Sequence, residues 1–122
     1  MAVSELNLID VFDAGDIDSE RVKFKVKKEC WLDDFLIMDN TYTENGAISN
    51  KYRHVYNFEC VKLYPGEIVY LYTKKGKNVV PTYNDESRTL RFYWGLGNTV
   101  WNKDGDTVHL IKIEKHDKIK VN

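Results

Sequence analysis

Residues 21–28 read RVKFKVKK, and this short stretch decides the fold class. Val22, Phe24 and Val26 alternate with lysines, which places apolar side chains on one side and charged side chains on the other. A repeat of two residues is the period of a β-strand, in which successive side chains point to opposite faces. The stretch therefore predicts a strand with one face buried and the other in water, as in antiparallel sheets.

The rest of the chain repeats this pattern in short runs. β-Branched and aromatic residues, which favour strands, fill EIVYLYT (67–73) and TLRFYW (89–94). Further strands are expected near 5–12, 34–39 and 52–58 and over DTVHLIKIE (106–114). A turn at KHDK (115–118) follows the last of these and precedes IKVN (119–122). Turn sequences lie between the runs: Ala14-Gly15-Asp16, Asn45-Gly46, Pro65-Gly66, Lys75-Gly76 and Asp104-Gly105. The pattern predicts an all-β sandwich or barrel of about seven to nine antiparallel strands.

Length and charge limit the classes of protein that fit. The 122 residues, 43% of them hydrophobic and 30% charged, are expected to form a single globular domain over 1–122. The net charge is −1, so no global field attracts nucleic acid or an anionic membrane, and any such binding needs a local patch. Neither a signal peptide nor an apolar run of ~20 residues is visible. We expect a cytoplasmic protein with no membrane insertion.

The two cysteines, Cys30 and Cys60, are expected to be free thiols, because the chain shows no export signal. The inter-sheet disulfide of antibody domains also needs a tryptophan buried between the two cysteines. Trp31 directly follows Cys30, so their side chains point to opposite faces of any strand. If Trp31 faces the core, Cys30 faces outward.

YWGLGNTVWNKDGDTVHLI (93–111) combines glycines with two tryptophans, a mixture found in ligand platforms and in tight turns beneath a large ring. In an all-β frame its parts separate into strand ends and turns. Trp94 and Trp101 flank these turns, where their rings can cover one end of a sandwich. The stretch is therefore interpreted as scaffold.

The same stretch resembles the closing motif of lamin-tail domains, a family of immunoglobulin-like β-sandwiches. Trp101-Asn102, Gly105-Asp106 and the alternating Val108 and Leu110 match that motif. Upstream, YNFECVKLYPGEIVYLYT (56–73) is similar to the family's extended piece. The residues assigned to the family motif are Phe58, Pro65, Gly66, Trp94, Trp101, Asn102, Gly105 and Asp106.

The resemblance covers about residues 21–121. It departs from the family at LDDF (32–35), where lamin-tail domains usually carry Leu-Ser-Gly-Trp and where Phe35 stands in for the tryptophan. It implies an immunoglobulin-like sandwich without catalytic machinery or cofactor. Such a module binds protein or serves a structural role, here within a larger assembly such as a phage particle or a surface complex.

Catalytic and metal-binding patterns are not found in the sequence. The serines lie in no Gly-x-Ser-x-Gly turn, and His54, His109 and His116 are scattered relative to the cysteines. Two acidic runs, DAGDIDSE (13–20) and NKDGD (102–106), lack the full calcium-loop spacing with its terminal glutamate. We expect no enzyme activity, no cofactor and no metal.

The alternative function is a nucleic-acid-binding β-domain that uses a basic strand face. The basic residues concerned are Lys23, Lys25, Lys27 and Lys28 on one strand and Lys74, Lys75 and Lys77 in a loop. The tyrosines available for stacking include Tyr42, Tyr52, Tyr56, Tyr70, Tyr72, Tyr83 and Tyr93. Basic strands with aromatics bind single-stranded nucleic acid, whereas solvated lysines merely discourage edge pairing. The near-neutral charge favours the solvated interpretation, and a basic stripe beside exposed aromatics would favour binding.

Overall fold

The computed structural model describes residues 3–42, 48–84, 86–101 and 106–121, with the backbone alone for 40–42 and 48–53. Its elements are β1 (Leu6–Phe12), β2 (Arg21–Val26), β3 (Cys30–Trp31), the 3-10 turn η1 (Leu32–Asp34), β4 (Phe35–Tyr42), β5 (Ile48–Asn57), β6 (Lys62–Leu63), β7 (Ile68–Tyr72), β8 (Thr89–Tyr93) and β9 (Val108–Lys112). The all-β prediction is confirmed.

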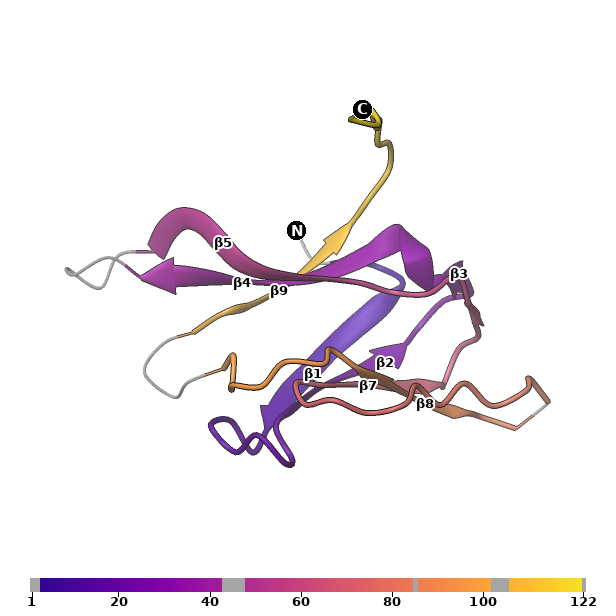
Figure 1. Ribbon diagram of the computed structural model, residues 1–122. Coiled ribbons are helices and arrows are strands. Elements are labelled where there is room, and N and C mark those ends of the chain that lie inside the picture. The colour runs from indigo at the N-terminus through magenta and orange to yellow at the C-terminus, as the bar shows by residue number, and fades with distance from the viewer. Residues whose placement is uncertain (1–2, 43–47, 85, 102–105, 122) are drawn as a thin grey trace.

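The strands form two layers that face each other (Figure 1). One is a four-stranded sheet in the order β1-β2-β7-β8, and the other is a three-stranded sheet in the order β5-β4-β9. The short β3 and β6 pair with each other to one side. No helical segment in the described part of the chain has the length and apolar character needed to span a membrane.

The sequence pattern located the longer strands and missed the shortest ones. The expected runs at 21–28, 67–73, 89–94 and 106–114 contain β2, β7, β8 and β9. The two-residue strands β3 and β6 were not expected, because so short a stretch shows no alternation. Residues 113–121 form no strand, and this segment leaves the body of the molecule beyond β9 (Figure 1).

The prediction that all strands pair antiparallel is wrong for β7 and β8. These strands are parallel, from Ile68 beside Thr89 to Tyr72 beside Tyr93. Parallel strands cannot be joined by a hairpin, so the chain must first return to the starting end of the sheet. The chain makes this return between β7 and β8, and within the described part Val79 pairs antiparallel with Arg91. The returning segment thus covers part of the outer edge of β8 and protects it from pairing with another chain.

The core lies between the two sheets and follows the alternation seen in the sequence. Val22, Phe24 and Val26 of β2 are all buried, as are Leu90 and Phe92 of β8. The ring of Phe58 meets those of Phe24 and Phe92 edge to face, with centroids 5.7 and 5.5 Å away. Edge-to-face contacts of this kind add to the stabilisation that burial provides.

Trp31 and Cys30 lie the opposite way round from the sequence expectation. Trp31 is 47% exposed, while Cys30 packs against the core. The register of β3 with β6 explains this, because Cys30 pairs with the buried Leu63 and Trp31 pairs with Lys62. Residues opposite each other in a ladder share a face. Cys30 therefore turns inward with Leu63, and the Trp31 ring lies beside the Lys62 ammonium, 5.7 Å from ring centre to Nζ.

Both thiols are free, and they differ in environment. Burial raises the pKa of Cys30 to about 11, with the nearby carboxylate of Glu5 adding to the shift. Partial desolvation and the carboxylates of Asp33 and Asp34 raise the pKa of the exposed Cys60. A thiol with a pKa near 11 is about 0.1% thiolate at pH 8, and the thiolate is the nucleophile.

Thiol titration is expected to find two reactive groups in denaturant without reductant. In the native protein Cys60 should react with iodoacetamide before Cys30, because Cys60 is exposed and Cys30 packs against the core. Peptide mapping by mass spectrometry identifies which thiol is alkylated first. Finding no free thiol in a chain of monomer mass would instead mean a bridge between the two cysteines.

Candidate functional site

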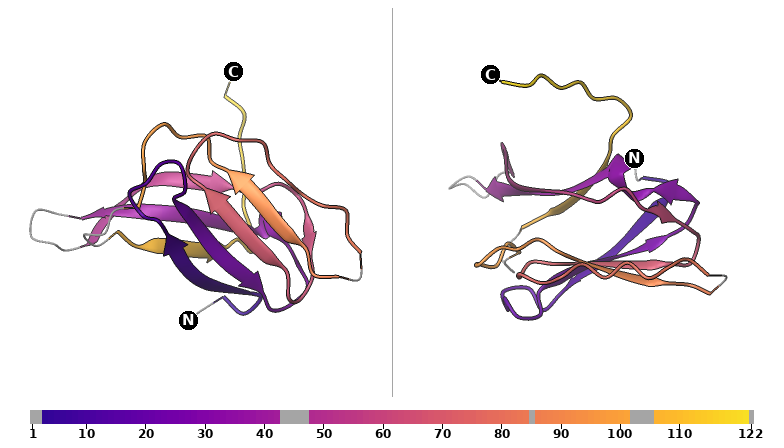
Figure 2. Two further views of the ribbon diagram at one scale, coloured as in Figure 1. Left: turned by 90° about the horizontal axis from the view of Figure 1, so that it is seen from below. Right: turned by 45° about the vertical axis from the view of Figure 1, so that its right-hand side comes forward.

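The outer face of the four-stranded sheet collects basic and aromatic side chains. Their positions follow from register, since residues directly across adjacent strands share a face. Arg21 of β2 lies beside Tyr72 of β7, which lies beside Tyr93 of β8. We call this set the aromatic–basic face, and it consists of Phe12, Arg21, Lys23, Tyr70, Tyr72, Lys74, Arg91 and Tyr93. Figure 2 (left) looks onto this side of the molecule.

Tyr70 is the centre of the aromatic–basic face. Three cations lie over its ring: the guanidinium carbons of Arg21 and Arg91, 5.7 and 5.3 Å from the ring centre, and Lys23 Nζ at 5.8 Å. Cations within about 6 Å of an aromatic centroid are attracted by the negative face of the ring. Tyr70 is half-buried, so part of the residue remains accessible to water.

Tyr72 and Tyr93 extend the aromatic–basic face towards the loop that follows β7. Their rings stack with centroids 4.9 Å apart and an interplanar angle of 14°. Lys74 Nζ lies 5.8 Å from the Tyr72 ring centre. The chain at Gly76 passes directly against the Tyr93 ring, which a Cβ atom at this position would overlap. The start of the loop after β7 therefore lies against the same side of the sheet as Lys23 and Lys25 of β2.

Positive charge gathers on this face although the chain as a whole is slightly acidic. Lys25 continues the row of Arg21 and Lys23 along β2 and is exposed. Two carboxylates offset part of the charge. Asp13 forms an ion pair of 3.0 Å with Arg21, and Asp10 lies beside Lys23 in the β1–β2 ladder.

The structure divides the predicted lysines into two groups. Lys23, Lys25 and Lys74 belong to this side of the sheet, as their register and ring contacts show. The others are exposed beyond its strands: Lys27 and Lys28 follow the end of β2, where both backbone N–H groups donate to the Glu5 carbonyl, and Lys75 and Lys77 lie in the loop after β7.

Sequence reasoning missed Phe12, Arg21 and Arg91 as members of the face. The signal was present for two of them. Arg21 is in phase with Lys23, and Arg91 alternates with the buried Leu90 and Phe92. Counting lysines alone therefore overlooked the arginines that lie closest to the Tyr70 ring.

The buried carboxylates of the molecule are held in structural hydrogen bonds. Arg88 donates to both oxygens of Glu67, through Nε at 2.5 Å and Nη2 at 3.1 Å, and the Tyr64 N–H adds a third bond of 2.8 Å. Both Oε atoms of Glu20 likewise accept hydrogen bonds from the surrounding chain. These hydrogen bonds tie together segments that are distant in the sequence, which gives both carboxylates a structural role.

The buried Asp39 and the partly exposed His54 form a pair on the other sheet. Asp39 Oδ1 accepts the His54 backbone N–H at 2.7 Å and lies 3.2 Å from His54 Nδ1. The imidazole also meets the Trp94 ring edge to face, with centroids 6.1 Å apart. The carboxylate and the tryptophan together hold the imidazole in place, which is a structural arrangement.

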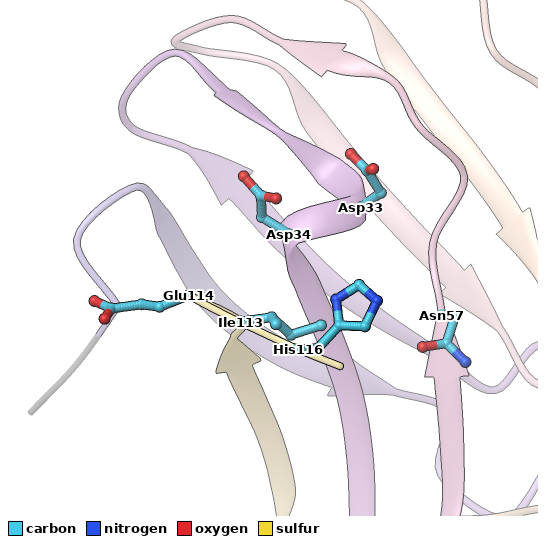
Figure 3. Close-up of a pocket in the computed structure, with 6 residues that line it drawn as sticks. All are labelled: Asp33, Asp34, Asn57, Ile113, Glu114 and His116. Atoms are coloured by element: carbon cyan, nitrogen blue, oxygen red, sulfur yellow. The ribbon is translucent and has the colours of Figure 1, made fainter. Parts of the chain in front are cut away.

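A pocket of about 410 Å³ lies where η1, the end of β5 and the segment after β9 meet (Figure 3). Its lining residues are Asp33, Asp34, Asn57, Ile113, Glu114 and His116. In Figure 3 the carboxylates of Asp34 and Glu114 point away from the His116 ring. Within the described ranges no group of three or more His, Cys, Asp or Glu side chains is arranged to hold a metal ion.

The family-motif residues act as scaffold where the structure describes them. Phe58 and Trp101 are buried, and Trp94 lies 6.3 Å from Trp101 between ring centres. Pro65 and Gly66 form a turn in which Gly66 has a φ of +91°, a conformation that favours glycine. Asp106 is half-buried and engaged in an interaction. Asn102, Gly105 and the turns at Asn45-Gly46 and Asp104-Gly105 lie outside the described residues.

The chain matched none of the family models, curated proteins or solved structures with which it was compared. The likeness to lamin-tail domains therefore stays a prediction from the motif.

Proposed function

We propose that this chain is a non-catalytic interaction module that binds its partner through the aromatic–basic face. The proposed scaffold is an immunoglobulin-like sandwich of the lamin-tail type. The two facing sheets and the burial of Phe58 and Trp101 support it. The resemblance implies a protein partner, which would have to present an acidic segment to this face.

The non-catalytic part of the proposal is supported by the buried polar groups. Glu20, Glu67 and Asp39 are each engaged by donors from the chain itself. The carboxylates that line the pocket in Figure 3 do not converge on its histidine. A general acid or base must lie within hydrogen-bond reach of the proton that it transfers, and these groups are occupied or dispersed.

The binding part rests on one observation: three cations surround the half-buried ring of Tyr70 in the middle of a sheet face. Two carboxylates lie next to these cations, both on the β1 side: Asp13 pairs with Arg21, and Asp10 lies beside Lys23 in the β1–β2 ladder. A concentrated positive patch on a chain of net charge −1 selects anionic partners and steers their approach.

Charge reversal on this face is expected to weaken the binding of anionic polymers. Replacing Lys23, Lys25 and Lys74 by glutamate should weaken the binding of polyglutamate or oligothymidylate by about tenfold or more, because rim charges govern electrostatic association. Stability should change by no more than about 1 kcal/mol, since the three side chains lie outside the core. Fluorescence anisotropy with labelled polymers measures the affinity, and urea unfolding measures the stability.

The matched control replaces Lys115, Lys118 and Lys120 by glutamate. It makes the same change in net charge within the exposed segment after β9, away from the four-stranded sheet (Figure 1). This variant should keep the affinity of the unmodified chain. Equal losses in the two variants, or no binding of any anionic polymer to the unmodified chain, would contradict the proposed function.

A further inference from the structure

We propose that the occupant of the aromatic–basic face is single-stranded nucleic acid. This inference rests on the proposed function, because it names the partner of the same face. It replaces the acidic protein segment that the family resemblance implies.

The face offers two kinds of contact at once, cations and aromatic rings, and single-stranded nucleic acid uses both. A single strand presents phosphates to cations and the flat faces of its bases to aromatic rings. An acidic homopolymer such as polyglutamate presents carboxylates alone, so it would use the cations of this face and not its tyrosine rings. Proteins that bind single strands combine a basic groove with aromatic side chains in this way.

The two kinds of contact lie on different strands, with cations on β2 and tyrosine rings on β7. A polynucleotide has a matching division between its backbone phosphates and its bases. The outward residues of β2 are all basic: Arg21, Lys23 and Lys25. Their neighbours in the β2–β7 ladder are Tyr72, Tyr70 and Ile68. A backbone that follows β2 would place its phosphates on the basic row and its bases over the rings of β7.

The next strand continues the base-binding side. Tyr93 and Arg91 of β8 lie beside Tyr72 and Tyr70. Both a tyrosine ring and a guanidinium plane can stack on a base. Lys74, over the Tyr72 ring, supplies a cation at the end of the row where the loop begins.

The same arrangement favours a single strand over a duplex. In a duplex the base faces are stacked inside the helix, where the tyrosine rings cannot reach them without unstacking energy. Every base has a π-face, so stacking on tyrosine tolerates any sequence. The face should therefore bind single strands in preference to double strands, with little dependence on sequence.

Fluorescence anisotropy of a labelled oligothymidylate of about 12 nucleotides tests the proposal directly. We expect micromolar affinity at low salt. The slope of log affinity against log salt should be about −2, because three phosphate contacts on β2 each contribute about −0.7. A duplex of the same length and a polyglutamate of matched charge should each bind more weakly.

Substitutions of Tyr70 distinguish the binding of nucleic acid from the binding of other anions. Tyr70→Leu should weaken oligothymidylate binding about 5- to 150-fold, the loss typical of one stacked base. Tyr70→Phe keeps the ring and should stay within about twofold of the unmodified chain. Polyglutamate binding should not change in either variant.

Ultraviolet cross-linking of the unmodified chain is a second test, with the labelled peptide mapped by mass spectrometry. It should label the segment of β7. This measurement does not depend on how a variant folds.

Three results would overturn the inference. One is an affinity for oligothymidylate that Tyr70→Leu leaves unchanged, with cross-links outside β2, β7 and β8. Another is tighter binding of duplex than of single strand. The third is tighter binding of polyglutamate, lost in the lysine-to-glutamate variant described above. That last result would leave the proposed function standing with an acidic protein as partner, whereas absence of all anionic binding would remove both proposals.

Discussion

Trp101→Ala is expected to lower the free energy of unfolding by about 3–5 kcal/mol, the cost typical of emptying a core tryptophan site. Trp101 is only 2% exposed and belongs to the core cluster. Its ring lies beside that of Trp94, which in turn contacts Tyr56 at 5.7 Å between ring centres. Removing the indole leaves a cavity that these neighbouring rings cannot fill without leaving their own contacts. Urea unfolding followed by circular dichroism measures the loss.

Trp31→Ala is the matched control, because the same side chain is removed from a site that is 47% exposed. We expect a change of no more than about 1 kcal/mol for this variant. Trp101→Phe should lie between the two, since it keeps an aromatic ring and removes Nε1, which is buried without a hydrogen-bond partner among the described residues. An unchanged urea midpoint for Trp101→Ala would show that the ring is exposed in solution, and the 93–111 stretch would again be a candidate ligand platform.

Glu20→Ala is expected to destabilise the protein by a similar amount, about 3–5 kcal/mol, because one fully buried carboxylate holds several donors. Its Oε1 accepts the backbone N–H groups of Gly15 at 2.9 Å and Trp101 at 3.3 Å. Its Oε2 accepts the Thr73 hydroxyl at 2.5 Å and the Val100 N–H at 2.9 Å. Without the carboxylate, the buried donors of Thr73, Val100 and Trp101 each lose a partner at about 1–3 kcal/mol, partly recovered where water enters, while the exposed Gly15 N–H can turn to water.

The effect should be specific to the buried position. Asp18→Ala removes an exposed carboxylate from the same loop and should change stability by no more than about 0.5 kcal/mol. A double-mutant cycle of Glu20→Ala with Thr73→Ala should give a coupling energy of about 1 kcal/mol or more, since the two side chains are in contact. Additive losses in that cycle, or a stable Glu20→Ala variant, would mean that the carboxylate does not join these segments.

Glu20 also shows where sequence reasoning about this chain stopped. In DAGDIDSE (13–20) it reads as one more carboxylate in a polar turn. Its partners at Thr73, Val100 and Trp101 lie more than fifty residues away in the sequence, and nothing local indicates them. A side chain whose role is to join distant segments leaves no periodic pattern, so only the fold reveals it.

The sequence predicted some of the lysines of the aromatic–basic face but not the residues that lie beside them. Alternation in RVKFKVKK placed Lys23 and Lys25 outside the core, and the structure agrees. Which strand would lie beside β2 depends on pairing, and the pairing brought Tyr70 and Tyr72 next to these cations. The pairing of β7 with β8 then placed Arg91 and Tyr93 beside Tyr70 and Tyr72. This pairing is parallel, whereas the sequence analysis expected antiparallel strands alone.

The sequence by itself determined the longer strands, their buried sides and the all-β class, because a period of two residues is a local property that each of these strands carries alone. Tertiary structure decided the order and direction of the strands, the inward turn of Cys30 beside Leu63 and the exposure of Trp31. It also decided that Glu20 would bond to Thr73 and that three cations would surround Tyr70. These features depend on which segments meet in space, and such meetings follow from the packing of the whole core rather than from any one stretch of the chain.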